Sequence, residues 1–295
     1  CYNIQQTTYI NLWGQGLTGS ISSEIGNLTN LYELILSNNQ LSGEIPIELW
    51  NLVNLEVLDL YQNNLTGDIP SEIGNLSNLS YLYLSDNQLS GELPPEIGHL
   101  TSLNNLVIWG NNLSGEIPSE IGNLTNLQVL SLSSNNLSGE IPSEIGNLIS
   151  LRELFFNSNN LTGQIPQEIG NLTNLELFFS DDNNLTGEIP ESIGDLISLN
   201  SLSLSYNGFV GQIPSQIGNL INLNGFLSLE NNQLSGEIPS SIGNLTNLVE
   251  LGLNQNNLVG DIPLEIGNLI HLESLSLGGN QLTGEIPSWI GNLTN

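Results

Sequence analysis

Basic side chains are almost absent from this sequence. Arg152 is the only residue among Lys and Arg, against thirty Asp and Glu, so the formal net charge of the 295 residues is −29. A nucleic acid partner is excluded, because a phosphate backbone requires a basic surface to neutralise it. An anionic membrane surface is disfavoured for the same reason. The balance favours cations, cationic partners or a saline medium as surroundings.

Cysteine, methionine and long apolar runs are also scarce or missing. The single cysteine, Cys1, excludes an internal disulfide. No stretch approaches the roughly 18 uninterrupted apolar residues of a membrane span, so we expect no membrane insertion in this chain. Because the chain has neither Met nor a basic, apolar leader at its start, we expect a processed or trimmed product.

Most of the sequence consists of one motif that is repeated with a period of 24 residues. Twelve units fill the chain, and the unit that begins at Leu223 carries one extra residue. The units begin at Thr7, Leu31, Leu55, Leu79, Leu103, Leu127, Leu151, Leu175, Leu199, Leu223, Leu248 and Leu272. Such self-similarity indicates a solenoid, in which each unit buries its apolar face against its neighbours.

Each unit contains signals for three kinds of local structure. Leu130 and Leu132 alternate with other residues, which predicts a short strand with one buried face. Gly43 and Pro46 mark a turn. The phrase "SEIGNL" is too short for a full helix and predicts a 3₁₀ or single-turn return.

An asparagine occupies the ninth position of every unit but the first, which has Gln15. A buried amide there can satisfy backbone groups where the chain turns away from the strand, so we predict a structural asparagine ladder. Its members are Asn39, Asn63, Asn87, Asn111, Asn135, Asn159, Asn183, Asn207, Asn232, Asn256 and Asn280.

The pattern L-x-x-L-x-L-x-x-N-x-L-[ST]-G-x-I-P-x-x-I-G-N-L-x-N resembles the plant-type leucine-rich repeat and covers nearly the whole chain. The resemblance implies an α/β repeat solenoid. It would be a right-handed superhelix with a parallel β-sheet on the concave face and short 3₁₀ or turn segments on the convex side. The L-[ST]-G-x-I-P part would add short strands beside that sheet.

The resemblance also divides the chain. Residues 1–30 are similar to the end of an N-terminal cap and a first, degenerate repeat, with Cys1 in the place of the cap's second cysteine, whose partner would lie upstream. Residues 31–295 form eleven tandem repeats, and we expect no C-terminal cap.

Positions three, five and seven of each unit face solvent in this arrangement, and aromatic residues gather there in the earlier units. These candidate ligand-binding residues are Tyr9, Trp13, Tyr61, Tyr81, Tyr83, Trp109, Phe155 and Phe179. Later units carry small residues such as Ser201 and Gly252. Grouped aromatic residues are typical of a recognition patch, although aromatic residues also simply favour strands.

The phenylalanine pairs Phe155–Phe156 and Phe178–Phe179 interrupt this regularity, and Ser180 replaces a core leucine. Two interpretations remain open: compensated repacking of the core, or a slot for a ligand.

The sequence contains no recognisable catalytic or metal-binding set of residues. His99 and His271 belong to no Ser-His-Asp or metal-binding set, so we expect no enzyme, no cofactor and no metal site. Rows of acids, one of which includes Glu44 and another Glu24, suit a saline exterior and weak divalent-cation binding.

We therefore predict a non-catalytic, extracellular scaffold for recognition or adhesion, secreted or at the cell surface. It would bind a peptide, protein or carbohydrate on its concave face. One alternative is a structural protein that associates head to tail into a filament or surface layer. Another is ice binding, because the repeat also resembles plant leucine-rich antifreeze proteins.

Overall fold

A computed structural model describes residues 6–292 of the chain. The expectation for Cys1 therefore lies outside the described residues. The chain divides into two compact units, residues 1–138 and residues 139–295.

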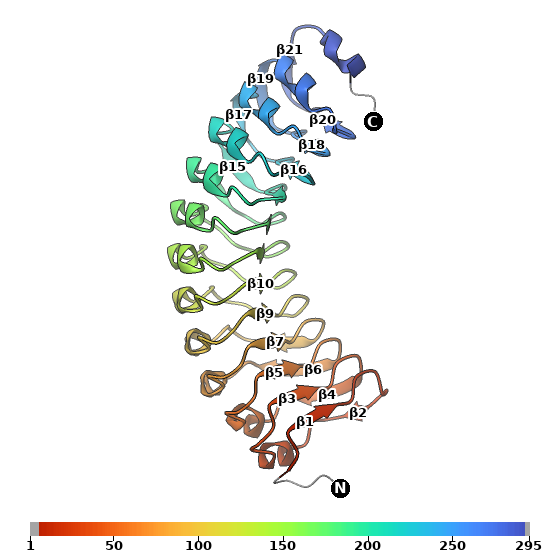
Figure 1. The fold of residues 1–295 in the computed structure, drawn as a ribbon, viewed down its shortest axis with the longest axis vertical. Coiled ribbons are helices and arrows are strands. Elements are labelled where there is room, and N and C mark those ends of the chain that lie inside the picture. Colours follow the sequence, from red (N-terminus) through yellow and green to blue (C-terminus); the bar gives the residue numbers. More distant parts are fainter. Residues whose placement is uncertain (1–5, 293–295) are drawn as a thin grey trace. The chain divides into compact units, whose positions relative to one another are not determined.

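Unit 1 stacks its coils around a parallel main sheet of short strands (Figure 1). In spatial order these are β1 (Tyr9–Asn11), β3 (Glu33–Ile35), β5 (Val57–Asp59), β7 (Tyr81–Tyr83), β9 (Asn105–Val107) and β10 (Val129–Ser131). Each strand pairs with the equivalent residues one repeat away, as Leu58 does with Leu82. An accessory sheet contains β2 (Thr18–Gly19), β4 (Gln40–Glu44), β6 (Asn64–Asp68) and β8 (Gln88–Ser90).

Unit 2 repeats this architecture. Its main sheet contains β11 (Glu153–Phe155), β12 (Leu177–Phe179), β14 (Ser201–Ser203), β16 (Phe226–Ser228), β18 (Glu250–Gly252) and β20 (Ser274–Ser276). Two accessory sheets lie in this unit. One pairs β13 (Thr186–Glu188) with β15 (Gly208–Val210), and the other joins β17 (Ser235–Glu237), β19 (Asn257–Asp261) and β21 (Gln281–Thr283).

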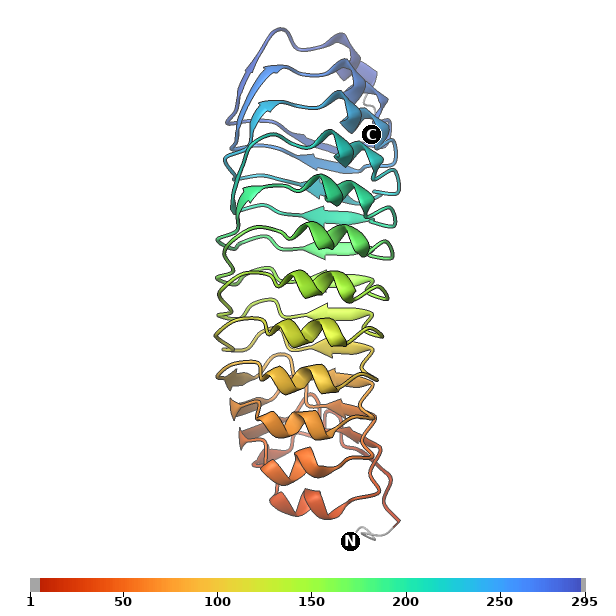
Figure 2. The ribbon, with the colours of Figure 1, turned by 90° about the vertical axis from the view of Figure 1, so that its left-hand side faces the viewer.

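Short 3₁₀ helices return the chain on the side of each unit opposite the main sheet (Figure 2). Unit 1 contains η1 (Ser23–Asn27), η2 (Ile47–Asn51), η3 (Ser71–Asn75), η4 (Pro95–His99) and η5 (Ser119–Asn123). Unit 2 contains η6 (Ser143–Asn147), η7 (Gln167–Asn171), η8 (Glu191–Asp195), η9 (Ser215–Asn219), η10 (Ser240–Asn244), η11 (Leu264–Asn268) and η12 (Ser288–Asn292). The predicted repeat solenoid, with parallel strands on one side and 3₁₀ segments on the other, is confirmed.

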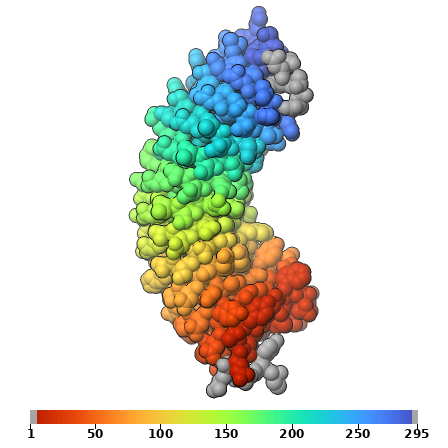
Figure 3. Space-filling model, in the orientation of Figure 1, coloured from red at the N-terminus to blue at the C-terminus, as the bar shows by residue number. Residues whose placement is uncertain are grey.

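The core of each unit is a set of stacked leucine and isoleucine columns. Leu58, Leu60 and Ile73 from one repeat are fully buried, and their equivalents in neighbouring repeats are buried. The space-filling view shows that side chains fill the space between successive coils of each unit (Figure 3). The period-two pattern therefore buries alternate strand residues, as expected for a sheet with one apolar face.

The turn after the ladder asparagine Asn63 requires glycine for two reasons. Gly67 has a φ of 83°, in the left-handed region that L-residues avoid. A Cβ at this position would also lie 2.7 Å from Cγ of Glu44 in the preceding coil. The repeated L-[ST]-G-x-I-P phrase thus reflects a turn geometry and a close approach between coils.

Ladder asparagines join neighbouring coils by hydrogen bonds. Oδ1 of Asn135 accepts from the backbone N–H of Leu113 at 3.0 Å. Its amide nitrogen donates to the carbonyl groups of Ile108 in the preceding coil and Leu132 in its own coil, both at 3.1 Å. Asn135 is buried, so these bonds satisfy backbone groups that water does not reach.

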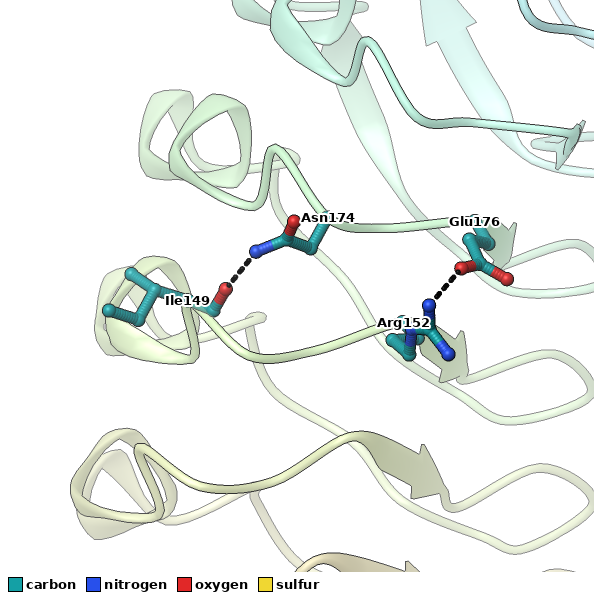
Figure 4. A network of polar contacts seen from close by, with 4 residues as sticks. All are labelled: Ile149, Arg152, Asn174 and Glu176. Atoms are coloured by element: carbon teal, nitrogen blue, oxygen red, sulfur yellow. Dashed lines mark hydrogen bonds and ion pairs between the residues drawn. The ribbon is translucent and has the colours of Figure 1, made fainter.

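A second asparagine row, which we did not single out from the sequence, lies at the last position of many repeats. Nδ2 of Asn174 donates to the carbonyl oxygen of Ile149 in the preceding coil at 2.9 Å (Figure 4). Asn54, Asn78, Asn126 and Asn222 make the same bond in their coils. Consecutive coils are therefore tied at two places.

The phenylalanine irregularity in unit 2 lies inside the core. Phe156 and Phe178 are fully buried beside the position where Ser180 replaces leucine. Ser180 is itself fully buried, and its hydroxyl has no hydrogen-bond partner. The burial of both rings favours compensated repacking over a ligand slot.

We predict that Asn135→Ala lowers the free energy of unfolding by about 2 kcal/mol, because it leaves the buried backbone N–H of Leu113 without its partner and removes one of the two side-chain hydrogen bonds that the Ile108 carbonyl accepts. Chemical denaturation followed by circular dichroism measures this change. The adjacent, exposed Asn136→Ala is the control and should change stability by less than about 0.5 kcal/mol. Equal effects of the two substitutions would contradict a structural role for the ladder.

A second prediction concerns Ser180. Ser180→Ala removes a buried hydroxyl that has no partner, so it should raise the free energy of unfolding by about 1 kcal/mol. Ser205→Ala provides the comparison, because the Ser205 hydroxyl lies 2.7 Å from that of Ser228 and accepts from the Glu230 N–H at 3.2 Å. Ser205→Ala should destabilise the protein, and thermal melts of both variants measure the opposite signs.

Candidate ligand-binding surface

The solvent-facing side of the main sheet carries the aromatic residues that the sequence singled out, and the structure separates them into groups. Tyr61, Tyr83 and Trp109 line one pocket in unit 1. Phe155 and Phe179 are in contact in unit 2. Tyr81 stacks on Tyr83, with ring centroids 6.3 Å apart and planes at 17°. Tyr9 and Trp13 are exposed at the start of unit 1 and do not line the pocket.

The unit 1 pocket arises from two rows of side chains on three consecutive coils. The fifth positions contribute Asp59, Tyr83 and Val107, and the seventh positions contribute Tyr61, Ser85 and Trp109. Neighbouring strands are ~4.8 Å apart, so each row forms a continuous line. We call these six residues the aromatic pocket; its volume is 330 Å³.

A small residue between two large ones creates the hollow. Ser85 lies between Tyr61 and Trp109 along the seventh-position row. The centroids of those two rings are 6.0 Å apart, at an angle of 53°. Two strand spacings would separate them by ~9.6 Å, so the rings lean toward each other across the serine.

Two polar side chains that line the aromatic pocket, Asp59 and Ser85, differ in their hydrogen bonding. The carboxylate of Asp59 accepts from the Ser37 hydroxyl at 2.5 Å and from the backbone N–H of Tyr61 at 3.1 Å. Ser85 is fully buried, and its hydroxyl has no hydrogen-bond partner. A buried hydroxyl without a partner costs free energy, which a ligand group could recover.

The Tyr83 hydroxyl remains protonated at neutral pH. Burial raises the pKa of Tyr83 above its usual value, and the nearby Tyr81 and Asp59 raise it further, whereas a hydrogen bond from Asn105 opposes the shift. Nδ2 of Asn105 donates to the Tyr83 oxygen at 3.4 Å. The aromatic pocket therefore offers a neutral phenol beside one carboxylate.

The phenylalanine group in unit 2 has a member that sequence reasoning missed. Phe179 contacts Phe155, with centroids 5.2 Å apart, and Phe226, with centroids 5.3 Å apart. The interpretation that small residues alone face solvent in the later repeats was therefore incomplete. Phe226 escaped notice because the unit from Leu223 is one residue longer, so counting from that leucine places Gly225 at position three.

A one-residue bulge places Phe226 on the surface. The Asn200 carbonyl accepts from the N–H groups of Asn224 and Gly225, but toward the next coil it is the Gly225 carbonyl that accepts, from Val249 and Glu250. A Cβ on Gly225 would lie 2.2 Å from Oγ of Ser201, so a side chain at this position would require the Ser201 hydroxyl to move. Aligning the x-Leu-x strand pattern backward from Leu227 would have identified Phe226.

Acidic groups accompany these phenylalanines. Glu230 and Glu250 line a hollow of 240 Å³ with Phe226 and several serines. Burial raises the pKa of Asp181, which a hydrogen bond with Ser203 partly offsets. Arg152 immediately precedes β11, and its guanidinium pairs with the carboxylate of Glu176 at 3.0 Å (Figure 4).

Metal-binding clusters and membrane-spanning helices have no counterpart in residues 6–292. Within this range, no group of three or more His, Cys, Asp or Glu residues is placed to hold a metal ion. No helix of the described part of the chain is both long and apolar enough to cross a membrane.

Comparison with known proteins gives consistent matches. The model of the leucine-rich repeat region matches residues 10–115. The leucine-rich repeat model matches residues 126–148, 150–172, 198–220, 226–245, 247–269 and 271–293. A curated relative, the LRR receptor-like serine/threonine-protein kinase GSO2 of Arabidopsis thaliana, is 53% identical over 53 residues, which are 18% of this chain and 4% of the relative.

Solved structures match over nearly the whole chain. The plant peptide hormone receptor RGFR1, in complex with RGF2, is 46% identical with a TM-score of 0.95, covering 97% of this chain and 46% of the receptor chain. A TDR receptor is 36% identical with a TM-score of 0.92, covering 98% of this chain and 50% of the receptor chain. The chain thus spans about half the length of these receptor structures and a small part of the curated relative. With the repeat geometry and both family models in agreement, the chain belongs to the leucine-rich repeat family, and its repeats are of the plant type.

Proposed function

We propose that this chain is part of the extracellular, non-catalytic region of a plant cell-surface receptor, and that it binds a peptide on the solvent-facing side of its main sheet. The observation that carries the proposal is the aromatic pocket, which lies on that side of the sheet in unit 1. The similarity to RGFR1, a plant peptide hormone receptor whose structure is that of a complex with RGF2, supports a peptide as the ligand.

The geometry suits an extended peptide. Equivalent positions of successive coils form straight rows, so a peptide lying across the strands would meet side chains at intervals of ~4.8 Å. The rows are held by the core and by inter-coil hydrogen bonds, and a preorganised surface lowers the cost of ordering on binding. Aromatic anchors in a partly buried pocket are the residues that dominate interface energetics.

A peptide-display experiment tests this proposal. The chain is panned against a random peptide library on phage, and the selected peptides are synthesised and titrated by calorimetry. We expect the Tyr61→Ala, Trp109→Ala double variant to weaken their binding by at least about 30-fold, because it removes two aromatic walls of the pocket.

Two controls sharpen the outcome. Tyr32→Ala removes an exposed tyrosine that does not line the pocket and should leave binding unchanged. Phe179→Ala, at the centre of the phenylalanine group, reports whether the peptide also engages unit 2. Failure to select any peptide, or selected peptides that tolerate the double variant, would refute the proposal.

The remaining sequence-based hypotheses stay predictions. Head-to-tail assembly predicts growth of scattered light with concentration, and ice binding predicts thermal hysteresis. A carbohydrate ligand would compete with the selected peptides for the aromatic pocket, and weak divalent-cation binding would appear in a calcium titration.

A further inference from the structure

The residues that line the aromatic pocket favour one kind of ligand side chain. Three rings from three consecutive coils line it, and Trp109 is one of them. The face of an aromatic ring carries negative charge density, and tryptophan attracts cations most strongly. A pocket with several such faces favours an apolar group or a cation over an anion.

Of these two kinds of ligand group, the carboxylate of Asp59 favours the cation. The chain's only Lys or Arg is Arg152, so unit 1 has no such side chain to neutralise this carboxylate. The hydrogen bonds that Asp59 accepts come from a neutral hydroxyl and a backbone amide, one on each oxygen. Each oxygen therefore retains capacity to accept a further bond, and a charged N–H donor would form the strongest.

The hydroxyl of Ser85 supplies an independent indication. It lines the pocket, is fully buried and has no partner. An N–H donor that entered the pocket could satisfy it, whereas an apolar side chain would displace water and leave both Ser85 and Asp59 without a ligand donor. Leaving such groups unpaired is what allows a polar site to reject an apolar analogue.

We propose that the aromatic pocket binds the basic side chain of a peptide ligand, and that it favours arginine over lysine. That the ligand is a peptide rests on the proposed function. That its bound side chain is basic rests on the groups that line the pocket. The planar guanidinium stacks on aromatic rings while its several N–H groups reach separate acceptors, here Asp59 and Ser85. Its aliphatic stem packs against the remaining ring surface.

A titration with single-residue probes tests the pocket even while the sequence of the peptide is unknown. The probes are N-acetyl-arginine amide, the lysine and norleucine equivalents, and N-acetyl-citrulline amide, which keeps the shape of arginine but is neutral. Binding is followed at low ionic strength by NMR of the Trp109 indole N–H, which is assigned by its loss in Trp109→Phe.

We expect the arginine probe to shift the Trp109 signal saturably and to bind at least about tenfold more tightly than citrulline. Asp59→Asn should weaken arginine binding about tenfold, and Ser85→Ala about threefold. Asp68→Asn is the matched control, because it removes one negative charge from the accessory sheet of the same unit and should change little. Circular dichroism checks that each variant is folded.

The peptides selected on phage complete the test. Replacing their basic residue by citrulline should weaken binding to the wild-type chain and should weaken binding to Asp59→Asn by a smaller factor. Equal binding of arginine and citrulline probes, or no movement of the Trp109 signal, would overturn this inference, even if peptides still bind through Trp109 and the proposed function stands. Arginine binding in the pocket without any selectable peptide would support the pocket assignment and refute the proposed function instead.

Discussion

The structure depends on the hydrogen bonding of one coil to the next. A single 24-residue coil cannot bury its leucines or satisfy its backbone, because its strand is three residues long and its 3₁₀ helix is five. Stacking buries the leucines and pairs the backbone groups. The ladder asparagine links two coils, because its side chain bonds backbone groups of its own coil and of the preceding one. An apolar residue in place of Asn135 would leave the buried backbone N–H of Leu113 unpaired.

Stacking also places the variable strand positions of successive coils side by side on one exposed face. Because the strands pair in register from coil to coil, a residue at a solvent-facing strand position neighbours its equivalent in the next coil, which is 24 residues away except across the 25-residue repeat. The interior columns tolerate little change, but the exposed rows can hold any side chain. In unit 1 a single small residue, Ser85, lies between Tyr61 and Trp109 in the row that lines the aromatic pocket.

Departures from the repeat are informative in unit 2 as well. The loss of leucine at position 180 is accompanied by two buried phenylalanines, so the volume of the core is maintained by neighbours. The extra residue before β16 is absorbed by a bulge at Asn224 and Gly225, which brings Phe226 against Phe179. Bulges commonly re-aim a side chain in this way.

The sequence alone determined the repeat length, the solenoid, the buried leucine columns and the turn glycines, because each follows from a periodic pattern that only one backbone path satisfies. It also identified Tyr61, Tyr83 and Trp109 as surface candidates. It did not reveal which rings meet, that Ser85 is buried without a partner, or that Phe226 joins the phenylalanine group. These features arise from side chains of different coils leaning across one another and from a bulge that breaks the count, so only the tertiary structure decided them.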